Sequence, residues 1–236
     1  PRCARTLAEA DFIAAEDTRV SLKLLNHLEI KKSLVSYHEH NKAESGGKIL
    51  ARLLAGETCA LVTDAGSPAI SDPGEDLVRL CAENGITVCA IPGPCALVTA
   101  LSISGLPTGR FTFEGFLSVN KKSRQEHLTG LKDETRTMIF YEAPHKLLAT
   151  LRDLADAFGE DRKISLCREL TKLHEEVRRM TLVEAAAYYE ENPPRGEFVL
   201  VVAGAEEKPE AGCTFEAALE LVRARMAKGL STKDAV

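Results

Sequence analysis

The sequence predicts an α/β protein made of two α/β domains. Short apolar runs alternate with amphipathic stretches, and the connections between them are short. In the first half this alternation predicts a mostly parallel sheet that helices cover on both faces. After a break at residues 105–109, where Pro107 stands between two glycines, the pattern starts again. We therefore place a hinge near residues 111–119 and a second α/β domain after it.

Turn and capping residues mark the helices of the first half. Gly56 is placed to end a helix at residues 41–55. Asp72 as N-cap and Pro73 in the first turn begin a helix that Gly85 ends. The expected strands are residues 11–15, 33–36, 59–63 and 86–91, and the expected helices are residues 20–28, 41–55, 72–85 and 95–104.

The second half carries similar signals. Ser123 with Glu126, and Thr181 with Glu184, form two capping boxes that predict helix starts. Pro144 is typical of a first helical turn. The expected strands are residues 137–141, 163–167, 175–180 and 198–202, and the expected helices are residues 125–131, 144–159, 181–191 and, after a polar linker at 206–210, 214–228.

Length and composition fit this organisation and exclude several protein classes. The chain has 236 residues, of which 44% are hydrophobic and 28% charged, so a disordered or fibrous protein is excluded. We expect an N-terminal domain at residues 1–110, a C-terminal domain at 111–205, and a linker with the start of a small helical region at 206–236. No apolar run approaches the roughly 20 residues of a membrane span, and we expect neither a signal peptide nor a membrane partner.

The cysteines point to a reducing compartment. There are seven of them, an odd number, and none forms a C-x-x-C pair. This favours reduced thiols in the cytoplasm and argues against a disulfide scaffold or a thiolate zinc site. The motifs G-x-G-x-x-G, G-x-x-x-x-G-K-[ST] and G-x-S-x-G are absent from the sequence, so nothing supports an NAD enzyme, an ATPase or a serine hydrolase.

The strongest candidate ligand loop is residues 63–74, between a buried strand and a helix. In an open α/β sheet this is the carboxyl edge, where ligands bind. Gly66 and Ala69 would let the backbone approach a ligand, and Asp64 can accept hydrogen bonds from an ammonium group or a hydroxyl. An ordinary helix-capping loop is the alternative, but the segment is longer than capping requires.

Two further strand-to-helix turns carry candidate residues. Pro92-Gly93-Pro94-Cys95-Ala96 places small residues at a helix N-terminus, where a polar or anionic group can bind; the alternative is that its prolines only fix a tight turn. In the second half, His145 and Lys146 lie in a first helical turn, where the helix dipole disfavours positive charge. Residues placed against local preference are functional candidates, although a solvated surface turn explains them equally well.

Polar clusters follow or precede other elements. Glu16, Asp17 and Arg19 follow the first expected strand, and His38 and His40 precede a helix. The two histidines are two residues apart and do not match H-E-x-x-H, so a metal site is not expected.

Together these segments resemble those of a known family. They are EDTR (16–19), SYHEHN (36–41), residues 64–74, PGP (92–94), FEGF (113–116), YEAPH (141–145) and RGEFVL (195–200). In this order they resemble the ribosomal RNA small subunit methyltransferase I family, which belongs to the tetrapyrrole-methylase superfamily of S-adenosylmethionine-dependent methyltransferases. The resemblance covers about residues 1–205.

The resemblance implies a fold, a reaction and a set of ligand residues. It implies two α/β domains of the tetrapyrrole-methylase type with S-adenosyl-L-methionine in the cleft between them, usually as a homodimer. It also implies 2′-O-methylation of a cytidine in the decoding centre of 16S rRNA, within the 30S subunit. The cofactor-binding residues implied by motif matching are Asp64, Gly66, Ala69, Ile70, Cys95, Ala96, Tyr141, Pro144, Glu197 and Phe198.

The chain departs from the family pattern in two places. Most relatives begin with a strand and a T-P-I-G-N-like turn that this sequence lacks, so we expect it to start within the helix that follows. Relatives often carry Ser where Cys95 stands, a small change in size and polarity.

Methyl transfer to a ribose hydroxyl needs alignment of the oxygen and removal of its proton. An acidic residue or histidine would act as base, Arg19 would hold phosphate, and no metal is required. Two alternatives stay open: a porphyrin-type methyltransferase, and a non-catalytic RNA-binding assembly protein. The catalytic candidates are Glu16, Asp17, Arg19, His38, His40 and His145.

RNA binding would depend on local basic groups. The net charge is −5, from 30 basic and 35 acidic residues, so the chain is not a uniformly basic nucleic-acid binder. The basic residues beside the expected ligand loops are Arg19, Lys121, Lys122, Arg124 and Lys146. For residues 121–124 the alternative, a solvated surface turn, explains the charges at least as well.

Overall fold

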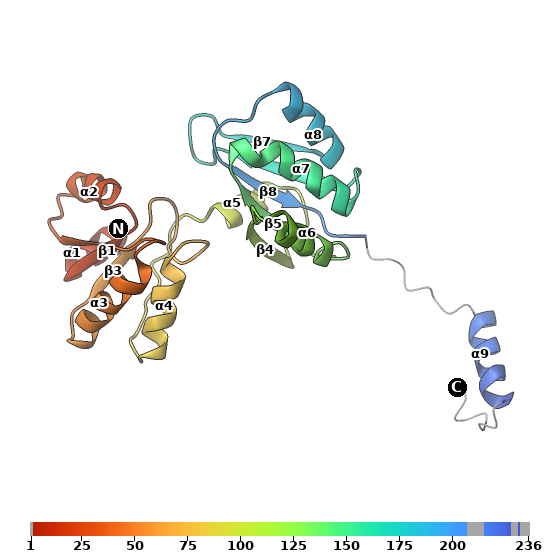
Figure 1. Cartoon of the computed structure of the whole chain (residues 1–236), viewed down its shortest axis with the longest axis horizontal. Helices are drawn as coiled ribbons and strands as arrows, with labels where there is room; N and C mark the ends of the chain where they lie inside the picture. The colour runs from red at the N-terminus through yellow and green to blue at the C-terminus, as the bar shows by residue number, and fades with distance from the viewer. Residues whose placement is uncertain (1, 207–214, 228–230, 232–236) are drawn as a thin grey trace.

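The computed structural model describes residues 2–206, 215–227 and 231, and their strands form two separate sheets (Figure 1). The first half of the chain forms a sheet of three strands in the order β2-β1-β3. The elements of this half are α1 (Arg2–Glu9), β1 (Phe12–Ala15), α2 (Thr18–His27), β2 (Ser33–Ser36), α3 (Lys42–Leu54), β3 (Cys59–Val62) and α4 (Gly74–Glu83).

The central strand β1 organises the first sheet. Both neighbouring strands run parallel to it, and all of its residues are buried. Because successive side chains of a strand point to opposite faces, Phe12 packs in a cluster with Ile49 of α3, and Ile13 packs in another with Leu25 of α2. The prediction of a parallel sheet covered on both faces is confirmed for this half.

The second sheet has five strands in the order β4-β5-β8-β6-β7. β4 and β5 are parallel, but the other three pairings are antiparallel, so the second half does not repeat the parallel arrangement of the first. The remaining elements are α5 (Ala96–Ile103), β4 (Phe111–Phe116), α6 (Lys121–Gly130), β5 (Thr137–Glu142), α7 (Pro144–Phe158), β6 (Lys163–Arg168), β7 (Glu176–Thr181), α8 (Leu182–Glu191), β8 (Phe198–Val202) and α9 (Phe215–Ala227).

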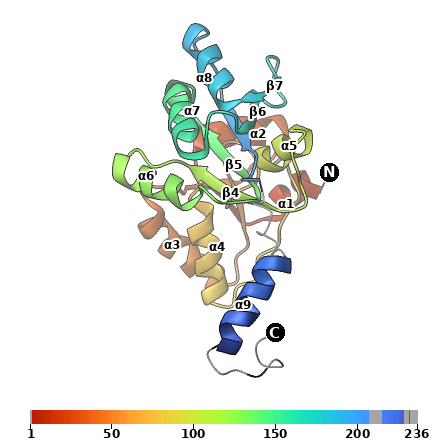
Figure 2. The ribbon, with the colours of Figure 1, turned by 90° about the vertical axis from the view of Figure 1, so that its right-hand side faces the viewer.

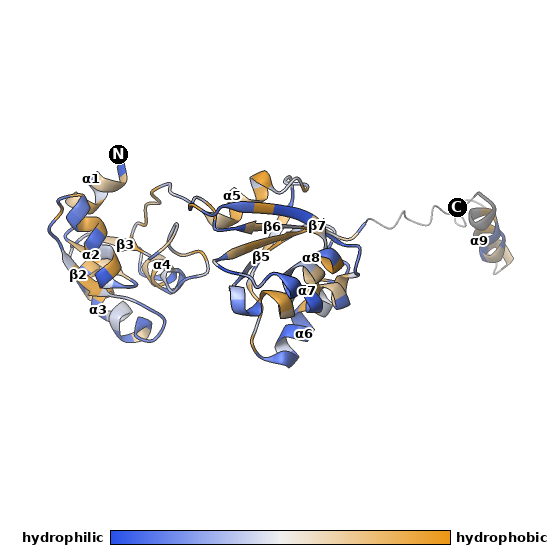
Figure 3. Ribbon diagram, turned by 90° about the horizontal axis from the view of Figure 1, so that it is seen from above, coloured by the Kyte–Doolittle hydropathy of each residue, from blue (hydrophilic) through white to orange (hydrophobic). Residues whose placement is uncertain are grey.

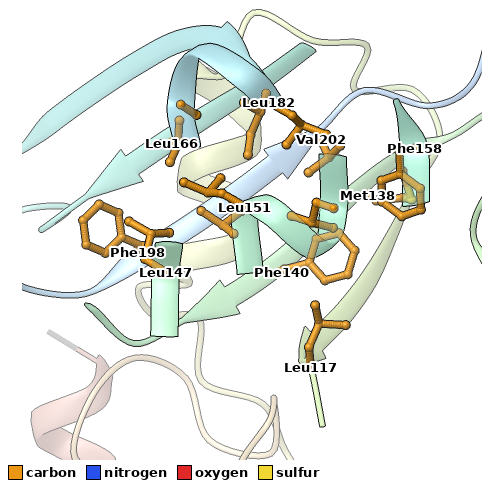
Figure 4. Close-up of a cluster of buried hydrophobic side chains, with 14 of the residues drawn as sticks. Leu117, Met138, Phe140, Leu147, Leu151, Phe158, Leu166, Leu182, Phe198 and Val202 are labelled. Carbon is orange, nitrogen blue, oxygen red and sulfur yellow. The ribbon is translucent and has the colours of Figure 1, made fainter. Parts of the chain in front are cut away.

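The larger hydrophobic core lies between the second sheet and the neighbouring helices α7 and α8 (Figure 2). Leu147 and Leu151 of α7 are fully buried, and in Figure 4 they lie beside Phe140 of β5 and Phe198 of β8. Figure 3 shows the contrast between the hydrophobic strand β5 and the mostly hydrophilic surface helix α6.

The opposite face of the second sheet is covered by α5, a helix that precedes the sheet in the sequence. Leu97 and Leu101 of α5 pack against Ile139 of β5 and Val201 of β8. The loop that leads into α5 therefore connects the first sheet to a helix that packs on the second. The expected domain boundary at residue 110 stays a prediction.

One expected strand is absent. Residues 86–91 pair with no strand in the part of the chain that the structure describes, and Val88 is 49% exposed. Their apolar composition favours a strand, but a strand also needs a hydrogen-bonded neighbour, and among the described strands β3 pairs with β1 alone.

Two other expectations are corrected. The segment taken as a hinge, residues 111–119, contains β4, which pairs along its length with β5. The capping box of Ser123 and Glu126 is also wrong: α6 begins at Lys121, and the Asn120 side chain accepts hydrogen bonds from the backbone N–H groups of residues 122 and 123. An Asn at the N-cap serves this purpose three residues earlier than the predicted box.

The other expected elements are present, some with shifted ends. Thr181 and Glu184 form the predicted capping box of α8, and Gly159, at a φ of 96°, ends α7. Most of the linker expected at 206–210 lies outside the described residues, as do residues 228–230. No described helix has the length and apolar character that crossing a bilayer requires.

The core predicts that substitutions of two leucines differ strongly in their effect on the free energy of unfolding. Leu151 is fully buried among the side chains of Figure 4, whereas Leu173 is 92% exposed. Replacing Leu151 by Ala removes buried methyl groups and leaves a cavity, so we expect a loss of about 2–5 kcal/mol in the free energy of unfolding. The matched variant Leu173→Ala should stay within about 0.5 kcal/mol. Urea unfolding followed by circular dichroism measures both, and equal midpoints would contradict the assigned core.

Candidate ligand and catalytic site

Three segments that are distant in the sequence meet in the structure. The loop after β3 contacts the turn before α5, where the Ser67 hydroxyl donates a hydrogen bond of 3.0 Å to the carbonyl oxygen of Pro94. The start of α5 contacts the end of β5, where the backbone N–H of Leu97 donates to the Tyr141 hydroxyl at 3.2 Å. The structure thus brings together the loop after β3, the N-terminus of α5 and a tyrosine of the second sheet.

The loop after β3 has an unusual backbone. Gly66, Ala69 and Ser71 adopt positive φ values of 83°, 67° and 60°. For Ala69 and Ser71 this conformation costs about 1–2 kcal/mol each, and such strained residues cluster at functional sites. One Asp72 carboxylate oxygen holds the loop by accepting from the N–H groups of Ala69 at 2.9 Å and Gly74 at 2.7 Å.

Small residues let this loop and the turn before α5 approach each other. A Cβ added to Gly66 would lie 3.4 Å from the carbonyl oxygen of Pro94, and one added to Gly93 would lie 3.3 Å from the Ser67 hydroxyl. At Gly74 an added Cβ would lie only 2.9 Å from the Leu61 side chain. The predicted need for small residues in these loops therefore has a geometric basis.

Tyr141 supplies a cap that α5 lacks within its own sequence. The N-cap residue Cys95 makes no side-chain capping bond, so the Tyr141 hydroxyl accepts from Leu97 in its place. Burial raises the pKa of Tyr141, which keeps the hydroxyl neutral. The ring also lies edge-on to Phe113, with centroids 5.0 Å apart.

Acidic side chains join the carboxyl ends of β1 and β3. The Thr63 hydroxyl donates to a Glu16 carboxylate oxygen at 2.8 Å, and the N–H of Asp17 donates to Asp64 at 3.2 Å. Glu16 and Asp64, predicted from separate motifs, therefore lie at one edge of the first sheet. Both already hold that edge together.

Asp17 is paired with Arg19. Its carboxylate caps α2 by accepting from the N–H of Arg19 at 2.8 Å, and it also binds the Arg19 guanidinium at 2.6 Å. These bonds lower the pKa of Asp17 to about 2. A carboxylate with so low a pKa is a poor base, whereas the Arg19 side chain is 87% exposed and can meet a phosphate.

The two histidines after β2 lie close together. The rings of His38 and His40 have centroids 6.0 Å apart, and His38 Nδ1 is buried with no hydrogen-bond partner among the described residues. Their segment is fixed by Asn41, whose side chain accepts from the N–H of His38 and donates to the carbonyl oxygen of Ser36. His145 is exposed in the first turn of α7. Within the described chain, no group of three or more candidate ligands could hold a metal ion.

Two hollows adjoin these residues. A narrow crevice is bordered by Glu16, Tyr37, Thr63 and Pro68, among others. A wider, open hollow of about 470 Å³ is lined by Glu39, Lys42, Ser71, Asp72, Pro73, Glu75 and Asp76.

The remaining predicted residues come from both halves, and those of the second half lie near Tyr141, because Glu142 at the end of β5 pairs with Phe198 at the start of β8. Ile70 is 45% exposed in the first-half loop, and Pro144 is the first residue of α7. Glu197 binds Lys172 at 2.9 Å on the surface, and the Phe198 side chain is buried in the core shown in Figure 4. At 2% exposed, Phe198 therefore offers no side-chain surface to a ligand.

Sequence reasoning missed Glu142 and misjudged Arg124. Glu142 is 4% exposed, and its carboxylate accepts from the Thr150 hydroxyl and from the N–H of Ala143. Arg124, expected to contact RNA, instead donates to Thr150 at 2.8 Å and pairs with Asp153 inside the domain. The YEAPH motif contains Glu142, but a pattern of residue types does not show that a carboxylate is buried.

The sequence and the fold match one enzyme class. Residues 1–186 match the family model of the tetrapyrrole (corrin/porphyrin) methylases. The methyltransferase CobJ has a TM-score of 0.62 with 19% identity, covering 90% of each chain. A uroporphyrin-III C-methyl transferase from Thermus thermophilus complexed with S-adenyl homocysteine has a TM-score of 0.57 with 17% identity, covering 86% of this chain and 89% of that one. At such identities the likeness shows the fold alone.

Much closer relatives carry a more specific name. A ribosomal RNA small subunit methyltransferase I from Synechocystis is 50% identical over 235 residues, which are 100% of this chain and 84% of the relative. One from Halalkalibacterium halodurans is 53% identical over 209 residues, 89% of this chain and 72% of the relative. The chain thus belongs to the tetrapyrrole methylases and, within them, to the family of these ribosomal RNA methyltransferases. Enzymes of this class use S-adenosylmethionine as methyl donor.

The hydrogen bond between Leu97 and Tyr141 predicts that removal of the Tyr141 hydroxyl lowers both stability and ligand affinity. Tyr141→Phe removes the acceptor and leaves the N-terminus of α5 uncapped, so we expect a loss of about 0.5–1.5 kcal/mol in unfolding free energy. Binding of S-adenosylhomocysteine, measured by calorimetry, should weaken as well. The control is Tyr188→Phe. It also removes a tyrosine hydroxyl, but it keeps the ring, which is the part of Tyr188 that Arg178 contacts. If Tyr141→Phe matches the parent in both measurements, the bond has no structural role.

Proposed function

We propose that the chain transfers a methyl group from S-adenosylmethionine to the 2′-hydroxyl of a cytidine in the decoding centre of 16S rRNA. It acts on the 30S subunit in the cytoplasm, as a homodimer. The observation that carries this proposal is the meeting of the loop after β3, the N-terminus of α5 and Tyr141 in a chain half identical to enzymes named for this RNA. The family name supports the RNA class, and the motif resemblance supports the cytidine and its 2′-oxygen.

The residues at this meeting point suit the cofactor. S-adenosylmethionine carries an ammonium group, a carboxylate, ribose hydroxyls and an adenine. Asp64 can accept from the donors, and Gly66, exposed and at a positive φ, leaves its backbone groups accessible to a ligand, whereas the Ala69 N–H is held by Asp72. Cys95 and Ala96, at the start of α5, offer small side chains beside a helix N-terminus.

The bound cofactor supplies an electrophilic methyl group, and the side chains of the chain must align and deprotonate the RNA hydroxyl. Asp17 is a poor candidate base, because its pKa is about 2. The candidates that we retain as base are Glu16, His38, His40 and His145. Arg19 is assigned to hold a backbone phosphate, because its guanidinium is exposed beyond its pairing with Asp17.

Lys121 and Lys122 are the exposed basic residues that we assign to RNA contact in the second half. Arg124 is left out, because its partners Thr150 and Asp153 lie within the protein. A few exposed cations suffice to position an RNA when shape and base contacts supply the specificity.

The reaction is tested with labelled cofactor. We expect the protein to transfer tritiated methyl groups from S-adenosylmethionine to 30S subunits isolated from cells that lack the modification. The label should map to the 2′-oxygen of one cytidine in 16S rRNA. Labelling of a tetrapyrrole in place of the subunit would favour the porphyrin-type alternative. Cofactor binding without any transfer to 30S subunits would contradict the proposed substrate.

The cofactor loop is tested at Ala69. A Leu at this position adds bulk in the turn and should reduce affinity for S-adenosylhomocysteine by about tenfold or more, which is about 1.4 kcal/mol. The matched control Ala69→Gly keeps the space and suits the positive φ, so it should bind like the parent. Calorimetry measures affinity, and thermal melting checks folding. Unchanged affinity in a folded Ala69→Leu protein would show that the loop only caps α4.

A further inference from the structure

Three aromatic rings lie together where β4 and β5 end. Tyr141 packs edge-on against Phe113 at 5.0 Å and against Phe116 at 5.6 Å between ring centroids. Phe113 and Tyr141 belong to the partly buried layer beneath α5, but Phe116 is 57% exposed. An aromatic ring that packs against one other ring while it stays largely in water has a face available for a ligand.

A β-bulge places Phe116 on this face. Phe113 pairs with Ile139, and the register then shifts so that Gly115 pairs with Phe140 and Phe116 with Tyr141. Side chains alternate along a regular strand, so without the bulge Phe113 and Phe116 would point to opposite faces. The extra residue puts both on the face of Tyr141 and α5. Bulges of this kind redirect side chains and are common beside active sites.

The bulge is held in place by specific contacts. Glu114, the residue left out of the pairing, binds His127 of α6 at 2.8 Å through Nε2. Gly115 adopts a φ of 63°, a conformation that glycine takes without strain. The exposure of Phe116 is therefore a fixed feature of the strand.

The exposed ring lies beside the segments assigned to the cofactor. A Cβ added to the neighbouring Gly115 would lie 3.8 Å from the hydroxyl of Ser71, a strained residue of the loop after β3. Tyr141, which touches Phe116, bonds to the N-terminus of α5. Phe116 thus borders the place where all three segments of the site meet.

We propose that Phe116 is a base-stacking residue, and that its exposed ring face receives a nucleobase. This inference rests on the proposed function, in which two nucleobases enter the site: the adenine of the cofactor and a base of the substrate RNA. Proteins bind unpaired bases by stacking them on exposed aromatic rings, and this contact depends on the ring and not on its apolar area alone.

The experiment compares variants that keep or remove the ring. Phe116→Leu keeps an apolar side chain, and Phe116→Trp keeps an aromatic face. The control is Phe111→Leu, because Phe111 is also exposed, at 39%, and lies at the other end of the same strand. Each variant is assayed for binding to S-adenosylhomocysteine by calorimetry and to 30S subunits by filter binding, and thermal melting checks that it is folded.

We expect Phe116→Leu to weaken one of the two bindings by about tenfold, with recovery in Phe116→Trp and no change in Phe111→Leu. A loss confined to S-adenosylhomocysteine assigns the adenine, and a loss confined to 30S subunits assigns an RNA base. Because the chain contains no Trp, Phe116→Trp also places a single tryptophan at the site, and quenching of its selectively excited fluorescence by the bound ligand would report stacking.

The inference is overturned if folded Phe116→Leu binds both ligands as tightly as the parent, or if Phe116→Trp fails to recover the loss. The result that overturns this inference can be told apart from the result that contradicts the proposed function. If the parent protein binds neither S-adenosylhomocysteine nor 30S subunits, the proposed function itself is wrong, and the inference falls with it.

Discussion

The hydrogen bond from the Leu97 amide to the Tyr141 hydroxyl links the two halves of the chain at the point where the candidate site forms. The turn that leads into α5 contacts the loop of the first sheet, and the body of α5 packs on the second. Tyr141 fixes the start of this helix, and Arg179 of β7 fixes its end by donating to the backbone carbonyl of Ser104 at 2.9 Å. The second half thus fixes both ends of α5, and the first half contacts the turn that leads into this helix.

Many charged groups of the site are already committed to structure. Glu16 and Asp64 join the ends of β1 and β3, and Asp17 caps α2 while it holds Arg19. Such bonds limit the freedom of the side chains, so the edge of the first sheet keeps its shape before any ligand arrives. A site built in this way aligns a reacting oxygen at a lower entropic cost than a mobile one.

Much of this architecture could be predicted from local sequence signals, because those signals act within a few residues. The box of Thr181 and Glu184 and the glycine that ends α7 depend on neighbouring residues alone. The failures share another cause. The strand expected at 86–91 lacks a pairing partner, and Arg124 finds its partners on a helix more than twenty residues away. The bulge at Glu114 likewise depends on His127 and on the register with β5. Such features follow from tertiary contacts, which no window of sequence contains.

The position of α5 affects how the protein can be divided. By sequence, α5 precedes the break at residues 105–109, but its apolar side chains Leu97 and Leu101 are buried by the second sheet. A fragment that ends at residue 110 would carry this helix without its covering surface, and the complementary fragment would expose Ile139 and Val201. Both pieces would then be prone to aggregation. Fragments cut before Pro92 would keep α5 with the sheet on which it packs, so that position is the better choice for expressing the halves separately.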